Sequence, residues 1–130
     1  MSVEEQSLIA AALAVRAMAH APYSAFAVGA ALASTDGRYF TGCNLENASF
    51  GLTVCAERNA LAAAIASGAK QFHTIVVATR GGVAPCGACR QVLAEFCAEL
   101  QVVRVDEQGQ VVARDNLSTL LPGRFGPHHI

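Results

Sequence analysis

Apolar residues follow a helical spacing in some parts of the chain and a strand spacing in others. Residues 3–20 are rich in Ala, Leu and Ile and end before Pro22, which predicts a first helix. The apolar run 26–35 predicts a strand, and the Asp-Gly pair at 36–37 is a strong hairpin signal. Residues 38–41 are therefore expected to form the returning strand.

Beyond this hairpin, helical and strand patterns alternate. We expect helices at 55–67, 87–100 and 117–121 and strands at 73–79, 102–105 and 110–113. This order predicts an α/β fold, a three-layer α-β-α sandwich with a mixed central sheet. No repeat or linker interrupts the pattern, so we expect a single domain over residues 1–130.

The composition excludes disorder and predicts self-association. Hydrophobic residues make up 53% of the chain and charged residues 15%, whereas soluble domains typically carry ~25% charged residues. Disorder needs the opposite balance. A lone small domain must cover a large surface with polar groups, and this chain has few, so a homo-oligomer is expected. The net charge of −1 offers no grip on a phosphate backbone, so nucleic acid is not an expected partner.

The start of the chain and its cysteines indicate a cytoplasmic protein. Residues 1–5 are acidic and lack the pattern of a signal peptide. The longest charge-free stretch, 17–35, contains His20 and Pro22, so no membrane span is expected. Five cysteines do not close into a disulfide framework. In a reducing compartment, clustered cysteines more often bind metal or take part in catalysis.

Three cysteines and one glutamate form the candidate chemistry. Cys55 opens one predicted helix, and Cys86 and Cys89 open the next, three positions apart and so on one helical face. A thiol at a helix N-terminus is shifted toward the thiolate, the form that ligates. Three thiolates and a water make a tetrahedral zinc site of the catalytic type. Glu57 follows the first cysteine closely enough to face that water.

Five motifs in a fixed order carry a resemblance to a known family. They are Tyr23–Leu32, Gly42–Phe50, Cys55–Arg58, Pro85–Gln91 and Leu120–Phe125. With them the chain resembles the small, homotetrameric, zinc-dependent cytidine deaminases of the cytidine/deoxycytidylate deaminase superfamily, nearly end to end. The zinc deaminase signature consists of a metal ligand, one arbitrary residue and a glutamate, followed later by P-C-x-x-C. In this chain Cys55 stands in place of the usual His ligand.

The resemblance implies a reaction and a cofactor. It implies one Zn²⁺ per subunit, held by Cys55, Cys86 and Cys89, and hydrolysis of cytidine and 2'-deoxycytidine to the uridine nucleosides plus ammonia, in pyrimidine salvage. Glu57 would carry protons, first from the attacking water to ring N3 and then to the leaving ammonia. Arg58 would hydrogen-bond the thiolates and offset their negative charge.

The resemblance also implies substrate contacts. It places Phe26 against the pyrimidine ring and Asn44 and Glu46 on the ribose hydroxyls. It lends three more residues across subunit contacts: Ala48, Phe50 and Phe125. Phe50 departs from the family, which more often has Tyr at this position, so a polar contact there is not carried over.

Other functions remain open at this stage. One is deamination of a different cytosine nucleoside, such as blasticidin S, although the intact 44–50 segment favours an ordinary ribose pocket. A polynucleotide deaminase would need a basic channel with aromatic platforms, which the net charge disfavours. A zinc module without catalysis would not need Glu57.

Overall fold

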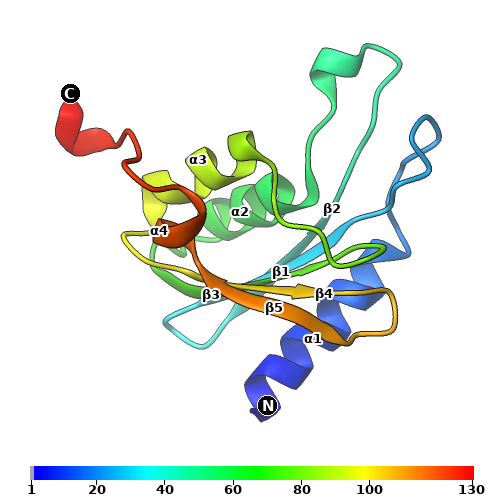
Figure 1. Cartoon of the computed structure of the whole chain (residues 1–130), viewed down its shortest axis with the longest axis horizontal. Coiled ribbons are helices and arrows are strands. Elements are labelled where there is room, and N and C mark those ends of the chain that lie inside the picture. Colours follow the sequence, from blue (N-terminus) through cyan, green and yellow to red (C-terminus); the bar gives the residue numbers. More distant parts are fainter. Residues whose placement is uncertain (1) are drawn as a thin grey trace.

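The computed structural model describes residues 2–130 and has the three predicted layers (Figure 1). A five-stranded sheet lies between α1 (Val3–Arg16) on one face and α2 (Ala56–Ala66) and α3 (Gly87–Phe96) on the other. The short α4 (Leu117–Leu120) follows the last strand. The prediction of an α/β fold with a mixed sheet is thus confirmed. Within the described chain, no helix has the length and apolarity needed to cross a membrane.

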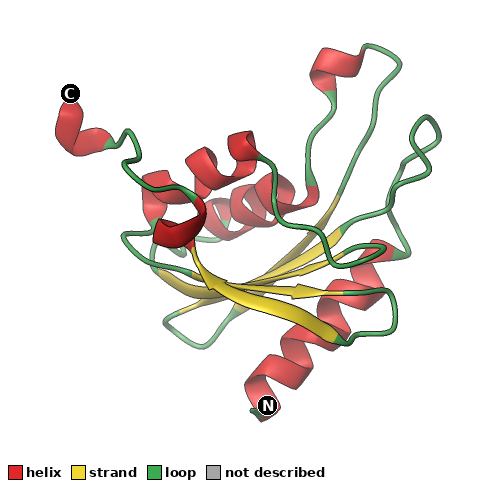
Figure 2. Cartoon of the chain, in the orientation of Figure 1, coloured by secondary structure: helices red, strands yellow, loops and turns green. Residues whose placement is uncertain are grey.

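The sheet mixes parallel and antiparallel pairs. Its strands are β1 (Gly29–Ser34), β2 (Tyr39–Cys43), β3 (Phe72–Ala78), β4 (Gln101–Val105) and β5 (Val111–Asn116). They lie in the order β2-β1-β3-β4-β5, shown as yellow ribbons in Figure 2. β3 and β4 are parallel and are joined through α3, while the other neighbouring pairs are antiparallel. The N-termini of α2 and α3 and the start of β1 therefore meet near the carboxyl end of β3.

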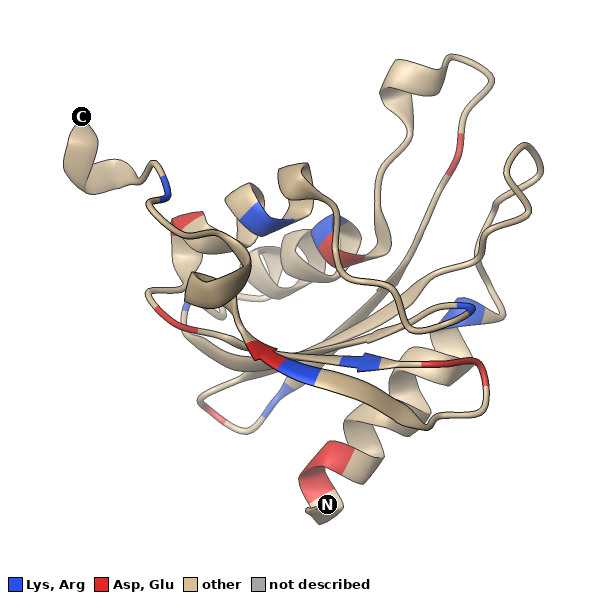
Figure 3. Cartoon of the chain, in the orientation of Figure 1, with Lys and Arg blue, Asp and Glu red and all other residues tan. Residues whose placement is uncertain are grey.

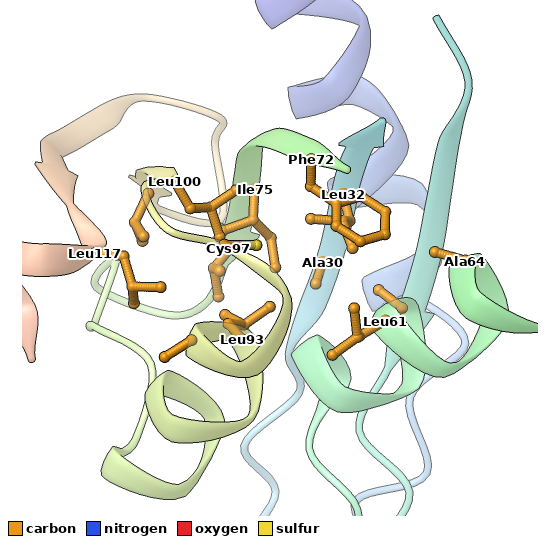
Figure 4. Packing of buried hydrophobic residues seen from close by; sticks show 14 of the residues in the cluster. Ala30, Leu32, Leu61, Ala64, Phe72, Ile75, Leu93, Cys97, Leu100 and Leu117 are labelled. Atoms are coloured by element: carbon orange, nitrogen blue, oxygen red, sulfur yellow. The ribbon is translucent and has the colours of Figure 1, made fainter. Parts of the chain in front are cut away.

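Alternation along the central strands divides the core between the two faces. In β1, Leu32 faces α2 and α3, whereas Ala31 and Ala33 face α1. Ile75 of β3 packs on the side of α2 and α3, where Leu93 and Leu117 complete the cluster (Figure 4). Because β1 is buried on both faces, its residues 29–33 form a continuous apolar run.

Two glycines allow helices to approach the sheet closely. A Cβ on Gly29 would lie 2.0 Å from the carbonyl oxygen of Ala12 in α1. A Cβ on Gly42 would lie 2.4 Å from the backbone nitrogen of Ala60 and 2.5 Å from the oxygen of Ala56 in α2. Both glycines are therefore required by packing, and Gly42 sets the position of the helix that carries Glu57.

Three predicted elements are each four residues longer than the observed ones. The first helix ends at Arg16, because His20 instead donates its backbone N–H to Asn44 and pairs with the segment before α2. β1 begins at Gly29 and not at Phe26, since the Asn44 side chain binds the backbone groups of the preceding loop. The third helix ends at Phe96, where the chain becomes extended.

Candidate metal centre and substrate pocket

Three thiols meet where the N-termini of α2 and α3 come together. Cys55 and Cys86 are the N-cap residues of these helices, and Cys89 lies in the first turn of α3. The Sγ atoms of Cys86 and Cys89 are 3.5 Å apart, and those of Cys55 and Cys86 are 4.0 Å apart. Ligand sulfurs in a tetrahedral zinc site lie about 3.8 Å apart, given a Zn–S distance of about 2.3 Å. The spacing and the soft donor set fit zinc.

Among residues 2–130, these three cysteines are the only group of His, Cys, Asp or Glu side chains that lie close enough together to share one metal ion. Glu57 is beside the group but is not a member of it. A three-ligand zinc site leaves one coordination position for a reactant, whereas structural sites use four protein ligands. The donor set therefore fits a metal centre of the catalytic type.

The surroundings shift the pKa values of two of the three thiols in opposite directions. Hydrogen bonds from the Cys89 thiol and from the Arg58 guanidinium lower the pKa of Cys55 to about 5. The same bond to Cys55, together with burial, raises the pKa of Cys89, which favours its protonated form in the absence of metal. Zinc is bound by thiolates, so its uptake must release that proton.

Glu57 is a buried carboxyl group next to the thiols. It lies in the first turn of α2, is 4% exposed, and lines the cavity that Cys55 and Cys86 also line. Burial, and secondarily the negative charge on Cys55, raises its pKa above that of an ordinary glutamate. A carboxyl group with a raised pKa exchanges protons more readily near neutral pH, which suits a group that is base and acid in turn.

The cavity has the size of a small-molecule site. Its volume is about 340 Å³, within the usual range for ligand pockets. Backbone segments from the α1–β1 loop, the end of β3 and the starts of α2 and α3 contribute to its wall. The lining residues are Ser24, Phe26, Val28, Asn44, Glu46, Thr53, Cys55, Ala56, Glu57, Val77, Thr79, Val83, Ala84 and Cys86.

The predicted substrate residues Phe26, Asn44 and Glu46 all lie in this wall. Asn44 is buried, and its Oδ1 accepts from the backbone N–H of Val28 at 2.9 Å while its Nδ2 donates to the carbonyl of Phe26 at 2.8 Å. Glu46 accepts hydrogen bonds from the loop at Ser24, and these lower its pKa. Both side chains therefore shape the loop as well as the pocket.

The other three predicted substrate residues lie outside this cavity within a single chain. Ala48 is exposed, Phe50 is 73% exposed and Phe125 is 59% exposed. Phe50 packs edge-on against Tyr23, with ring centroids 5.7 Å apart, at the rim of an adjoining cavity. Their predicted contacts involve a neighbouring subunit, so they remain predictions.

Sequence analysis gave no role to three residues that shape the site. The Thr79 hydroxyl accepts from the backbone N–H of Val83 at 2.8 Å and folds the loop after β3; its place at the end of a buried strand was an available signal. The Arg80 guanidinium lies 5.4 Å from the ring centroid of Phe26. Ser24 was part of a quoted motif, but its bond to Glu46 needed the structure.

This α/β sandwich, with three thiols beside a buried carboxylate, has the architecture of a zinc-dependent hydrolase. A family model for the cytidine and deoxycytidylate deaminase zinc-binding region matches residues 2–105. The chain therefore belongs to the cytidine and deoxycytidylate deaminase family.

Curated relatives and solved structures agree with this assignment. The chain is 42% identical to the cytidine deaminase of Sporosarcina psychrophila, over 95% of this chain and 92% of the relative. It is 47% identical to that of Halalkalibacterium halodurans, over 95% of each. A crystal structure of cytidine deaminase from Burkholderia pseudomallei superposes with a TM-score of 0.88 at 48% identity, covering 96% of this chain and 100% of that one. A crystal structure of cytidine deaminase from Mycobacterium tuberculosis superposes with a TM-score of 0.84 at 39% identity, covering 96% of this chain and 99% of that one.

Proposed function

We propose that this protein hydrolyses cytidine and 2'-deoxycytidine at C4, giving uridine and 2'-deoxyuridine plus ammonia. The observation that carries the proposal is one cavity lined by Cys55, Cys86 and Glu57 together with Phe26 and Glu46. One end of this cavity would hold the metal that activates water, and the other end would bind the nucleoside. The relatives named cytidine deaminase support the choice of substrate.

The chemistry divides between the metal and Glu57. Zinc held by Cys55, Cys86 and Cys89 supplies Lewis-acid activation of a water molecule. The Glu57 carboxylate accepts a proton from the attacking water and delivers it to ring N3, which makes C4 electrophilic. It then transfers the second proton of that water to the departing amino group, which leaves as ammonia. One water is consumed, and Glu57 returns to its starting state.

The nucleoside end of the pocket selects for ribose without phosphate. Phe26 presents an aromatic ring for the pyrimidine, and Asn44 and Glu46 present polar groups for the sugar hydroxyls. Because hydrogen bonds from Ser24 and the backbone lower the pKa of Glu46, its carboxylate is ionised at neutral pH. An anion here favours hydroxyl donors and repels phosphate groups.

We further propose that residues 1–130 act as one domain within a homotetramer in the cytoplasm, with one zinc per subunit and a role in pyrimidine salvage. The low charged fraction supports self-association. So do exposed apolar side chains such as Leu52 and Phe50. In this assembly Ala48, Phe50 and Phe125 would contribute to neighbouring pockets. Light scattering after gel filtration gives the subunit number directly.

The charge distribution disfavours a polynucleotide substrate. Among residues 2–130, basic and acidic positions are interspersed along helices, strands and loops and do not form a continuous basic stripe along the ribbon (Figure 3). A single-strand binding channel would need such a stripe.

A substrate panel tests the proposal. The zinc-loaded protein is offered cytidine, 2'-deoxycytidine, cytidine 5'-monophosphate, blasticidin S and a cytosine-containing DNA oligonucleotide. We expect turnover of the two free nucleosides and at least about a hundredfold lower kcat/KM for the others. A preference for blasticidin S or the oligonucleotide would replace the proposed function, and inactivity on every member would favour a non-catalytic zinc module.

A further inference from the structure

Ser24 lies in the wall of the cavity, in the loop between α1 and β1, and binds two of the proposed substrate residues. Its hydroxyl donates a hydrogen bond to Oε2 of Glu46 and accepts one, 3.0 Å long, from the backbone N–H of Phe26. A serine hydroxyl has one proton and two acceptor lone pairs. The hydroxyl proton is therefore donated to Glu46, and one lone pair accepts the hydrogen bond from Phe26.

The hydrogen bonds to Glu46 leave it with one free acceptor direction. Its Oε1 accepts from the backbone N–H groups of Tyr23 at 3.0 Å and Ser24 at 3.2 Å. An ionised carboxylate offers about four acceptor positions, and three of them are taken. The remaining position is on Oε2, the oxygen that the Ser24 hydroxyl also binds. Ser24 thus determines where a ligand donor meets Glu46.

The same residue fixes the backbone at Phe26. The N–H of Phe26 is held by Ser24 and its carbonyl by Asn44. Ala25, between Ser24 and Phe26 in the sequence, has a φ of 57°, in the left-handed region that residues with a Cβ rarely adopt. Such a conformation persists only where surrounding bonds enforce it. The bond from Phe26 to the Ser24 hydroxyl spans Ala25 directly.

We propose that Ser24 is a positioning residue for the nucleoside, aligning the free acceptor of Glu46 with a ribose hydroxyl and the Phe26 ring with the pyrimidine. The inference rests on the proposed function, since it concerns the two substrate residues of that pocket. Ser24 itself need not touch the substrate.

The test compares Ser24→Ala with Ser24→Thr, which keeps the hydroxyl. For cytidine we expect Ser24→Ala to raise KM about tenfold, as for loss of a hydrogen bond to a charged group, and to change kcat less than about threefold. Ser24→Thr should keep KM within about threefold of the wild type. The same comparison is made with 2'-deoxycytidine and 3'-deoxycytidine. One of them lacks the hydroxyl that meets Glu46, and for that analogue Ser24→Ala should raise KM less than it does for cytidine.

Ser118→Ala is a matched control. Ser118 donates from its hydroxyl to Oε2 of Glu99 at 2.6 Å and from its backbone N–H to Oε1 at 3.2 Å, the same pattern away from the cavity. It should leave KM unchanged and lower Tm about as much as Ser24→Ala does.

Two outcomes overturn the inference. One is an unchanged KM in Ser24→Ala. The other is a Ser24→Ala variant that loses kcat/KM equally for cytidine and both deoxy analogues and whose Tm falls further than that of Ser118→Ala. That combination indicates a structural role alone. A wild-type protein that does not turn over cytidine contradicts the proposed function itself, which separates the two failures.

Discussion

Nη2 of Arg58 lies 3.6 Å from Sγ of Cys55 and donates a hydrogen bond to it, from the first turn of the helix that Cys55 caps. Zinc with three thiolates is formally an anion, which by itself makes a bound water less acidic. Arg58 and the positive ends of two helix dipoles counter that charge. We therefore expect Arg58 to support both retention of the metal and activation of the water.

Arg58→Gln should lower kcat on cytidine and increase the rate of zinc loss to a chelator, each by about tenfold or more, the usual effect of removing a partner of a metal ligand. The circular dichroism spectrum should not change. Arg38→Gln is the control, because Arg38 pairs with Asp36 in the β1–β2 turn and not with a cysteine. Wild-type turnover and zinc content in Arg58→Gln would remove Arg58 from the account.

Arg90 connects the metal-binding loop to the C-terminal part of the chain. Its Nε donates to the carbonyl of Pro85 at 2.8 Å, directly before Cys86, and its Nη1 donates to the carbonyl of Leu120 at 2.7 Å. Lysine cannot span both carbonyls as a planar guanidinium does. Arg90→Lys should therefore destabilise the protein by about 1–3 kcal/mol and speed zinc release. Denaturant unfolding and chelator competition measure the two effects, and equal zinc release in both proteins would argue against this connection.

Gly42 tests the packing of α2 on the sheet. Gly42→Ala places a Cβ against the backbone of α2 at distances that real structures do not tolerate, so the helix must shift. We expect a loss of about 1–3 kcal/mol or more, with reduced activity because α2 carries Glu57. Gly51→Ala is the control, since within one chain its Cβ would meet open space. Equal unfolding midpoints for the two variants would be inconsistent with the observed packing.

The buried Glu57 predicts a pH-dependent stability. Its pKa is raised in the folded state, so the protonated form is favoured by folding. The resulting stability is complete below the ordinary carboxyl pKa and is lost as pH rises through the folded-state pKa. In zinc-free protein, Glu57→Gln should therefore raise Tm at pH 8, and the gain should shrink toward pH 4. Glu95→Gln, at an exposed position of α3, is the control for removal of a carboxyl group. A gain for Glu57→Gln that grows on acidification would contradict the sign.

The layers and the closeness of Cys86 to Cys89 were predictable because their signals are local. The β-branched run along β3 and the helical spacing of Cys86 and Cys89 depend on a few neighbouring residues, and the structure has the predicted strand and helix there. The start of β1 was not predictable, because the amide of Asn44, sixteen positions further on, binds the backbone groups of Phe26 and Val28. The order of the strands depends on equally distant pairings.

Part of the site was beyond sequence analysis for the same reason. The contact of Arg80 with Phe26 joins two loops, and no local pattern predicts it. Ala48, Phe50 and Phe125 remain predictions, because the pockets they are expected to reach belong to other copies of the chain.

The most direct measurement follows the absorbance change from cytidine to uridine with one preparation before zinc removal, after it and after zinc is restored, alongside zinc-loaded Glu57→Gln. The account predicts that turnover disappears with the metal and returns with it, and that Glu57→Gln retains zinc but loses at least about a hundredfold in kcat. Wild-type turnover in protein shown by elemental analysis to lack metal, or in zinc-loaded Glu57→Gln, would contradict it.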